Sequence, residues 1–115
     1  MTLSQQRVLF THLISRLVLA GTDMGYHIAY DQIRRTYTEA QQNVAKGIGI
    51  VNSLHIVGLA ADLLLYEDAG GYLVDSTAYR ELGKIWKSYD PLCCWGGDFT
   101  KQDPGHFSMT WQGVK

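Results

Sequence analysis

An apolar run of strand length, Leu59 to Leu65, is the feature that most limits what this chain can fold into. Its length and apolarity favour a strand, although its Ala and Leu content also suits a buried helical turn. Because side chains alternate across a strand, the run then has two faces. One face carries Ala60, Asp62 and Leu64, and the other carries Ala61, Leu63 and Leu65. The run therefore predicts a buried strand with one carboxylate on it.

The N-terminal segment predicts an amphipathic helix, because its apolar residues recur at spacings of three and four. The predicted stripe contains Val8, Leu9, His12, Leu13, Arg16, Leu17 and Leu19. His12 and Arg16 interrupt the segment, so it resembles neither a signal peptide nor a membrane span of roughly 20 apolar residues. We expect a protein that stays in the cytoplasm of the cell that makes it, without stable membrane insertion. His12 and His27 lack ligand-spaced neighbours and are expected to be packed or capping residues.

The rest of the chain alternates helical and extended patterns. An extended segment is expected around Tyr26 to Tyr30, and Thr36 or Thr38 can cap a second helix. A hairpin turn at Gly70 and Gly71, followed by a strand, is expected within residues 66–75. A helix is expected over 76–90, with Ser76 or Thr77 as its cap and an apolar stripe of Leu82, Ile85 and Trp86. Two more strands are expected around the bends at 96–97 and 103–105. Residues 1–115 thus predict one α+β domain with a small antiparallel sheet and about three helices.

Charge and cysteine content exclude several classes of partner. The chain has 10 Lys and Arg against 11 Asp and Glu, a formal charge of -1, so no global field attracts nucleic acid or an anionic membrane. Cys93 and Cys94 are adjacent, and neighbouring residues rarely reach disulfide geometry. We expect them to be small buried residues of a protein made in a reducing compartment.

Four side chains suit a metal-dependent hydrolase: His55 and Asp62 in "SLHIVGLAAD", then Asp103 and His106 in "DPGHF". Two imidazoles and one carboxylate form a three-ligand set that leaves the fourth position of tetrahedral zinc open. The Pro-Gly bend brings Asp103 and His106 to one side of a turn, so His106 can bind the metal while Asp103 accepts a proton. Taken separately, however, His55 also fits a hydrogen-bonded core histidine and Asp62 a turn or cap.

Small and aromatic residues flank these four. Gly58 permits close backbone approach, and Ala60, on the face of Asp62, leaves room above a metal. Trp95 and Trp111 lie on either side of "DPGHF" and suit either the core or stacking on a ligand. Asp98, beside the Gly-Gly bend, suits either support of a ligand histidine or stabilisation of the turn.

The first motif resembles a family signature. "SLHIVGLAAD" matches the Ser-x-His-x-x-Gly-x-Ala-x-Asp pattern of the M15 peptidases at Ser53, His55, Gly58, Ala60 and Asp62. "DPGHF" is similar to the family's Asp/Glu-x-x-His motif. "RRTYTEAQQN" resembles its Arg-Thr segment and Gln-bearing helix, and "WGGDF" its Gly-rich turn before the second motif. The resemblance extends over roughly residues 30 to 108.

The resemblance implies a fold of the hedgehog/D,D-peptidase type and one catalytic zinc ion. It makes His55, Asp62 and His106 the zinc ligands and Asp103 the general base. It also implies that Arg35, with Arg34 as its rival, stabilises the developing oxyanion. Ser53, Gln42 and Asp98 are then expected to bind substrate or to support the site.

The resemblance further implies a zinc-dependent peptidoglycan peptidase that hydrolyses an amide bond in stem peptides. The short chain, without a signal peptide or a separate wall-binding domain, resembles an L-alanyl-D-glutamate endopeptidase that serves as a phage or prophage endolysin. Such a monomer accumulates in the host cytoplasm and reaches the wall after a holin-type partner permeabilises the membrane. The alternatives are a D-Ala-D-Ala carboxypeptidase or dipeptidase, and a catalytically silent, zinc-stabilised structural or wall-binding module of a phage.

Overall fold

The structure is a computed structural model that describes residues 1–33, 53–68, 70–73 and 76–115. The elements in these ranges are α1 (Leu3–Asp23), β1 (His27–Gln32), β2 (Ala60–Tyr66), α3 (Ser76–Tyr89), β3 (Cys93–Trp95), the 3-10 turn η1 (Gly96–Asp98) and β4 (His106–Met109). The α+β prediction is confirmed, with two α-helices and one four-stranded antiparallel sheet in the described residues. The helix expected after Thr36 or Thr38 lies outside them.

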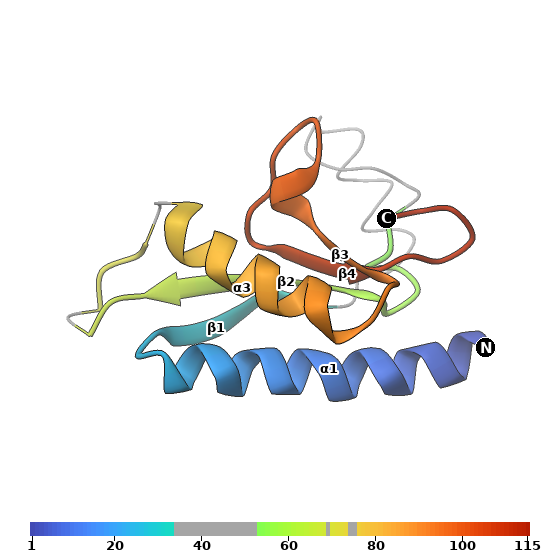
Figure 1. Cartoon of the computed structure of the whole chain (residues 1–115), viewed down its shortest axis with the longest axis horizontal. Helices are drawn as coiled ribbons and strands as arrows, with labels where there is room; N and C mark the ends of the chain where they lie inside the picture. Colours follow the sequence, from blue (N-terminus) through green and yellow to red (C-terminus); the bar gives the residue numbers. More distant parts are fainter. Residues whose placement is uncertain (34–52, 69, 74–75) are drawn as a thin grey trace.

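The sheet has the strand order β1-β2-β4-β3, and each neighbouring pair is antiparallel (Figure 1). The apolar run therefore forms a strand, β2, in the interior of the sheet. Its side chains alternate as predicted, because Ala61, Leu63 and Leu65 are buried in the main core. The register pairs Asp62 of β2 with His106 of β4. Two residues that are 44 positions apart in the sequence thereby become direct neighbours.

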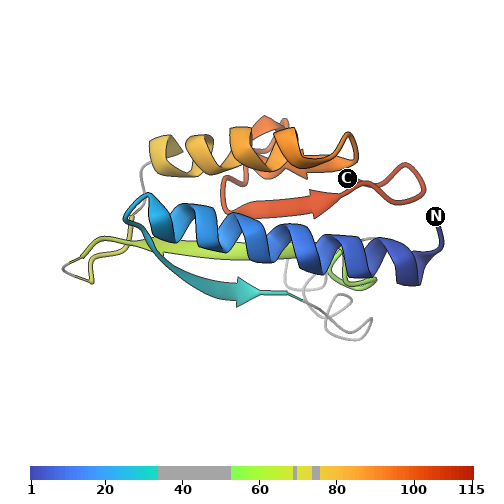
Figure 2. The ribbon, with the colours of Figure 1, turned by 60° about the horizontal axis from the view of Figure 1, so that its bottom comes forward.

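Both helices pack on one side of the sheet (Figure 2). The Trp86 ring of α3 is the centre of this layer, with its centroid 5.7 Å from that of Phe10 in α1 and 6.2 Å from that of Phe107 in β4. Trp86 Nε1 also donates hydrogen bonds of 3.0 Å to the backbone carbonyls of Cys94 and Ser108. The buried indole thus fixes α3 against the two C-terminal strands.

The buried side of α1 differs from the predicted stripe. Its buried residues are Gln6, Phe10, Leu13, Ile14, Leu17 and Gly21. Val8 and Leu19 are 72% and 65% exposed, and His12 is exposed as well. At 100° per residue these three lie opposite Phe10 and Leu17, and apolar residues occur on both sides of this helix. The spacing of apolar residues alone therefore does not determine which side is buried. The expectation of a packed His12 is wrong, because this residue lies on the exposed side.

Three other local predictions can be compared with the structure. The strand expected after the hairpin is reduced, among the described residues, to a single bridge between Tyr66 and Tyr72, and only Gly70 of the Gly pair has a positive φ, of 86°. His27 is an exposed residue of β1 that pairs with Asp68 at 2.6 Å rather than a packed histidine. Cys93 and Cys94 are free thiols, and Cys93 is buried as expected, whereas Cys94 is only partly buried. Burial raises the pKa of Cys93 to about 12.

The predicted C-terminal helix is confirmed as α3, which ends at Tyr89, just before Pro91. Leu82 and Trp86 of its predicted stripe are fully buried, and Ile85 is partly buried. Neither described helix combines the length and the apolar character that crossing a membrane requires.

Candidate metal centre

The side of the sheet opposite the helices carries Asp62 and His106. Leu63 and Phe107, the next residue in each strand, belong to the main core beneath the helices. Because successive side chains of a strand point to opposite faces, Asp62 and His106 face away from that core. The pairing of β2 with β4 therefore builds two of the predicted ligands into one rigid position.

His55 reaches the same place from the loop before β2. Ser53 Oγ accepts a hydrogen bond of 3.2 Å from the His55 backbone N–H, and the Leu59 N–H donates to the Leu54 carbonyl at 2.9 Å. Gly58 has a φ of 75°, so it is required by the left-handed turn of this loop. Arg7 Nε of α1 donates to the Val57 carbonyl at 2.6 Å and fixes the loop to the helix layer.

The three groups converge on the Asp62 carboxylate. His55 Nε2 lies 3.4 Å from Asp62 Oδ2, and His106 Nδ1 lies 3.3 Å from Asp62 Oδ1. One ligand atom from each residue falls within 4.8 Å of the other two, and the two imidazole centroids are 5.4 Å apart. The structure thus brings together the three residues that the sequence singled out as metal ligands.

Hydrogen bonding fixes which nitrogen of His55 faces the site. His55 Nδ1 lies 2.9 Å from the Ile33 backbone carbonyl oxygen, which can only accept a hydrogen bond. Nδ1 must therefore carry a proton, which leaves Nε2 as the ring nitrogen that can bind a metal beside Asp62. A backbone carbonyl on the second nitrogen is a common way to orient a metal-binding histidine. His55 is 3% exposed, so its ring has little freedom to turn.

The environment keeps Asp62 ionised. Burial alone would raise the pKa of this carboxyl group. Hydrogen bonds from His106 and His55, together with the positive charge these rings can carry, outweigh the burial and hold the pKa of Asp62 well below its ordinary value. His106 Nε2 is buried and has no hydrogen-bond partner among the described residues, and the Phe99 ring lies 5.5 Å from the imidazole centroid.

The donor set fits a zinc ion. Zinc bonds to histidine nitrogen and carboxylate oxygen are about 2.0–2.1 Å long, so the edges of a regular tetrahedron around zinc are about 3.3–3.4 Å. The two contacts to Asp62, at 3.3 and 3.4 Å, are close to this length, but they reach different carboxylate oxygens, and the three donor atoms lie within 4.8 Å of one another. They are longer than the 2.7–2.9 Å of typical charge-assisted hydrogen bonds. Three nitrogen and oxygen donors also leave one tetrahedral position for water or substrate.

Asp103 lies beside this group. Its backbone N–H donates to the Gly96 carbonyl at 2.9 Å, and its own carbonyl accepts from the His106 N–H at 3.0 Å, which is the predicted turn. A cleft of about 200 Å³ is lined by both Asp62 and Asp103, and by Asp31, Tyr72 and Tyr79. Partial burial and then the negative charge of Asp62 raise the pKa of Asp103, against the opposing influence of the two histidines. A carboxylate with a raised pKa is a stronger base at neutral pH.

The remaining predicted site residues are placed differently. Arg35 and Gln42, and the rival Arg34, lie outside the described residues. Asp98 is exposed in η1 and pairs with Lys87 Nζ at 2.7 Å, rather than with a site histidine. Trp95 is buried, and Trp111 is partly buried against the core.

Two contributors to the site were missed by the sequence analysis. The Ile33 carbonyl is a backbone group, so no side-chain motif could have identified it as the partner of His55. Phe99, which contacts His106, belongs to "WGGDF", and the resemblance of that segment to the family's turn was the available signal.

The chain is similar to a family model and to solved structures. A family model of the M15 peptidases, described as D-alanyl-D-alanine carboxypeptidase, matches residues 46–109, more than half of the chain. No curated protein sequence matches the chain.

Two solved structures share the fold. The L-Ala D-Glu endopeptidase ChiX of Serratia marcescens has a TM-score of 0.71 and 20% identity, over 87% of this chain and 79% of that chain. A variant of the vancomycin resistance D,D-pentapeptidase VanY, in complex with Zn(II), has a TM-score of 0.60 and 20% identity, over 89% of this chain and 71% of that chain.

Proposed function

The chain belongs to the M15 family of zinc metallopeptidases, and from that premise we propose that it cleaves peptidoglycan stem peptides between L-Ala and D-Glu. The observation that carries the proposal is the convergence of His55, Asp62 and His106 beside the carboxylate of Asp103. A purely structural zinc site has four protein ligands and needs no base. Three ligands with a neighbouring carboxylate instead suit hydrolysis.

Each residue then has a definite task. His55, Asp62 and His106 would hold one zinc ion, which when bound supplies a Lewis acid that lowers the pKa of a coordinated water to about 7. Asp103 takes the proton from the attacking water and returns it to the leaving amine. The hydrogen bond from His55 to Ile33 keeps the imidazole in the required tautomer.

We further propose tasks for residues that the resemblance implicates. Arg35, with Arg34 as its rival, would donate hydrogen bonds to the oxyanion that develops at the scissile carbonyl. Gln42 would contact the substrate. Ser53 already accepts a hydrogen bond from the His55 backbone, so its task is to hold the ligand loop.

The choice of the L-Ala–D-Glu bond is supported by the greater fold similarity to ChiX, at a TM-score of 0.71, than to VanY, at 0.60. The alternative is a D-Ala-D-Ala carboxypeptidase, which the description of the family model favours. Mass spectrometry of digested muropeptides distinguishes the two. We expect products with a new D-Glu N-terminus, and no digestion after chelation until zinc is restored. Release of D-Ala alone would replace the proposal by the alternative.

Two substitutions separate catalysis from zinc-stabilised structure. Asp103→Ala should keep bound zinc and lower the rate by about 10²–10⁴-fold, the usual contribution of a general base. His55→Ala should lose both zinc and activity. Zinc content by mass spectrometry and turbidity of wall suspensions provide the two readouts. Full wall lysis by Asp103→Ala would exclude the assigned role of Asp103.

We propose that the cellular role is that of a monomeric, single-domain endolysin of phage or prophage type. The resemblance of the chain to the L-alanyl-D-glutamate endopeptidases of this family that serve as phage endolysins supports this role. Expression in a susceptible host should then cause lysis only when a holin-type pore is co-expressed. Lysis without the pore, or none with it, would contradict the role but not the peptidase activity.

A further inference from the structure

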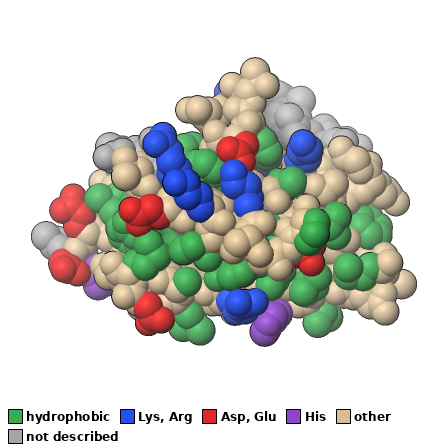
Figure 3. Space-filling model, viewed as in Figure 1, with side chains coloured by type: hydrophobic (Ala, Val, Ile, Leu, Met, Phe, Trp, Pro, Cys, Tyr) green, Lys and Arg blue, Asp and Glu red, His purple; other side chains and the backbone are tan. Residues whose placement is uncertain are grey.

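A basic hollow lies on the outer side of α3, next to the metal-site cleft. It has a volume of about 260 Å³ and is lined by Arg80, Lys84, Lys87, Trp95, Gly97, Asp98, Gln102 and Pro104. The Lys and Arg side chains gather over α3 on the face of the molecule in Figure 3. Spacings of four and three residues place the three cations on one side of the helix.

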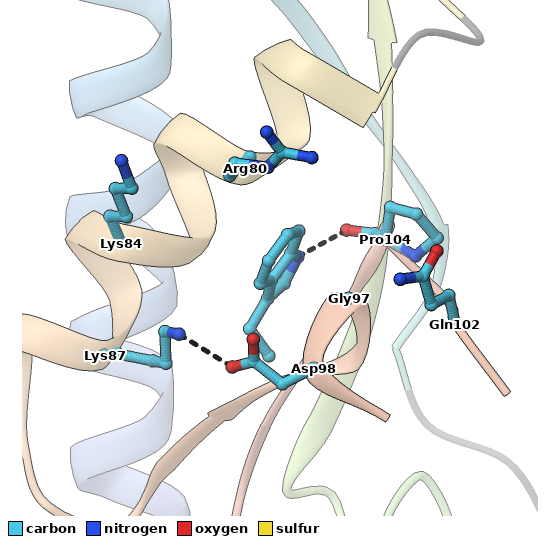
Figure 4. A pocket seen from close by; sticks show the side chains of 8 residues that line it. Arg80, Lys84, Lys87, Gly97, Asp98, Gln102 and Pro104 are labelled. Atoms are coloured by element: carbon cyan, nitrogen blue, oxygen red, sulfur yellow. Dashed lines mark hydrogen bonds and ion pairs between the residues drawn. The ribbon is translucent and has the colours of Figure 1, made fainter. Parts of the chain in front are cut away.

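The charge of the hollow is only partly compensated. Lys87 Nζ is paired with Asp98 Oδ2 at 2.7 Å, as Figure 4 shows. Within the described part of the chain, neither Arg80 nor Lys84 has an ion-pair partner. Arg80 extends from α3 toward the loop that carries Gln102 and Pro104 (Figure 4). Two cations are therefore available to an anion, and a guanidinium binds a carboxylate through two parallel hydrogen bonds.

The floor of the hollow is rigid. The Trp95 indole lies between Gly83 of α3 and Gly97 of η1, and a Cβ on either glycine would approach the ring to 2.3 or 2.2 Å. Trp95 Nε1 also donates a hydrogen bond of 2.7 Å to the Pro104 carbonyl. The indole therefore holds the loop that carries Gln102 and Pro104 in a fixed position relative to α3.

The hollow adjoins the metal-site cleft at a single turn. Pro104 lines both, and Asp103 lies on the side of the cleft. The cleft is acidic, with Asp31, Asp62 and Asp103, whereas the hollow is basic. An extended substrate that crosses this turn would place its scissile amide beside Asp103 and an anionic group beside Arg80.

We propose that the basic hollow is a subsite for a carboxylate of the substrate's stem peptide, next to the bond that is cut. This inference rests on the proposed function, because D-Glu and the C-terminus of the stem supply the free carboxylates. A volume of about 260 Å³ accommodates a short peptide arm more readily than an anionic polymer. The other source of an anion, the phosphate of wall polymers, becomes an outcome of the test.

The test compares a stem peptide with the same peptide in which each carboxylate in turn is converted to an amide. For the wild-type protein, amidation of one carboxylate should raise KM by about tenfold, equivalent to about 1.4 kcal/mol. The double variant Arg80→Gln/Lys84→Gln should cleave the peptide with the free carboxylate and the amidated peptide with the same KM. The matched control Lys101→Gln/Lys115→Gln removes two exposed cations outside the hollow and should keep the preference.

Each contrary result has a separate meaning. A double variant that keeps the preference for the carboxylate would overturn the subsite while leaving the peptidase intact. The double variant could instead keep the wild-type KM for soluble peptides and lose binding only to walls that retain phosphate polymers. In that case the ligand of the hollow is a phosphate of the wall and not a carboxylate of the stem peptide. Failure of the wild-type protein to cleave any of the peptides would overturn the proposed function itself.

Discussion

Replacement of Gly96 by alanine tests how the metal centre is held together. A Cβ at this position would lie 2.1 Å from the Asp103 carbonyl oxygen and 2.7 Å from His106 Cβ. To reach ordinary contact, the Asp103 carbonyl must retreat by about 1.3 Å. Both contacted groups belong to the turn that carries the proposed base and one proposed metal ligand, so Gly96→Ala should move them together. A displacement of this size costs on the order of 10²-fold in rate.

The assay for Gly96→Ala has three readouts: zinc affinity by competition with a chelator, kcat/KM on a stem peptide, and the thermal midpoint. We expect weaker zinc binding, a loss of activity on the order of 10²-fold, and destabilisation of about 1–3 kcal/mol from overpacking. Gly71→Ala is the matched control, because its Cβ would make only ordinary contacts with the Glu67 carboxyl group, at 3.7 and 3.8 Å, and its φ is not in the left-handed region. Wild-type zinc affinity and activity in Gly96→Ala would refute the reasoning.

Two further predictions concern stability. Gly83→Ala should lower the free energy of unfolding by about 1–3 kcal/mol, because its Cβ would lie 2.3 Å from the rigid Trp95 ring. Helix propensity alone predicts the opposite, a gain in stability of about 1 kcal/mol. A raised melting temperature in calorimetry would therefore contradict the predicted clash with Trp95. In the metal-free protein the pKa of Asp103 is raised above its ordinary value of 3.8, so the stability contributed by the protonated carboxyl group is lost as the pH rises through the folded-state pKa. Asp103→Asn should therefore be more stable than wild type at neutral pH and lose this advantage below the ordinary pKa, as measured by urea unfolding; equal stabilities at neutral pH would exclude the effect.

The sequence predicted the parts of the fold that local patterns determine. The strand at residues 59–65, the helix that ends before Pro91 and the bends beside β3 and β4 follow from apolar run length and from Gly and Pro positions. The buried side of α1 did not follow, because Val8 and Leu19 are as apolar as the residues that pack. The buried side of that helix is determined by its contacts with the sheet and with Trp86. The spacing of apolar residues within the helix carries no information about these contacts.

The candidate site shows the same division. The identities of His55, Asp62 and His106 were accessible from motif spacing, but their convergence depends on the pairing of β2 with β4. The tautomer of His55 depends on a backbone carbonyl at Ile33, which any residue could supply. Sequence therefore identifies the candidate donors, and the register of a non-local strand pair determines how far apart Asp62 and His106 lie.

The loop from Trp95 to His106 joins the metal centre to the basic hollow. Its two ends are connected twice: the Gly96 carbonyl accepts from the Asp103 N–H, and Trp95 Nε1 donates to the Pro104 carbonyl. His106, at one end of this loop, is a proposed metal ligand, and Trp95, Gly97, Asp98, Gln102 and Pro104 of the loop line the hollow. Because both connections involve the same turn, a carboxylate bound beside Arg80 would restrain the backbone that positions Asp103. The proposed subsite should thus affect the rate of cleavage as well as the affinity for substrate, and an amide in place of the carboxylate should lower kcat in addition to raising KM.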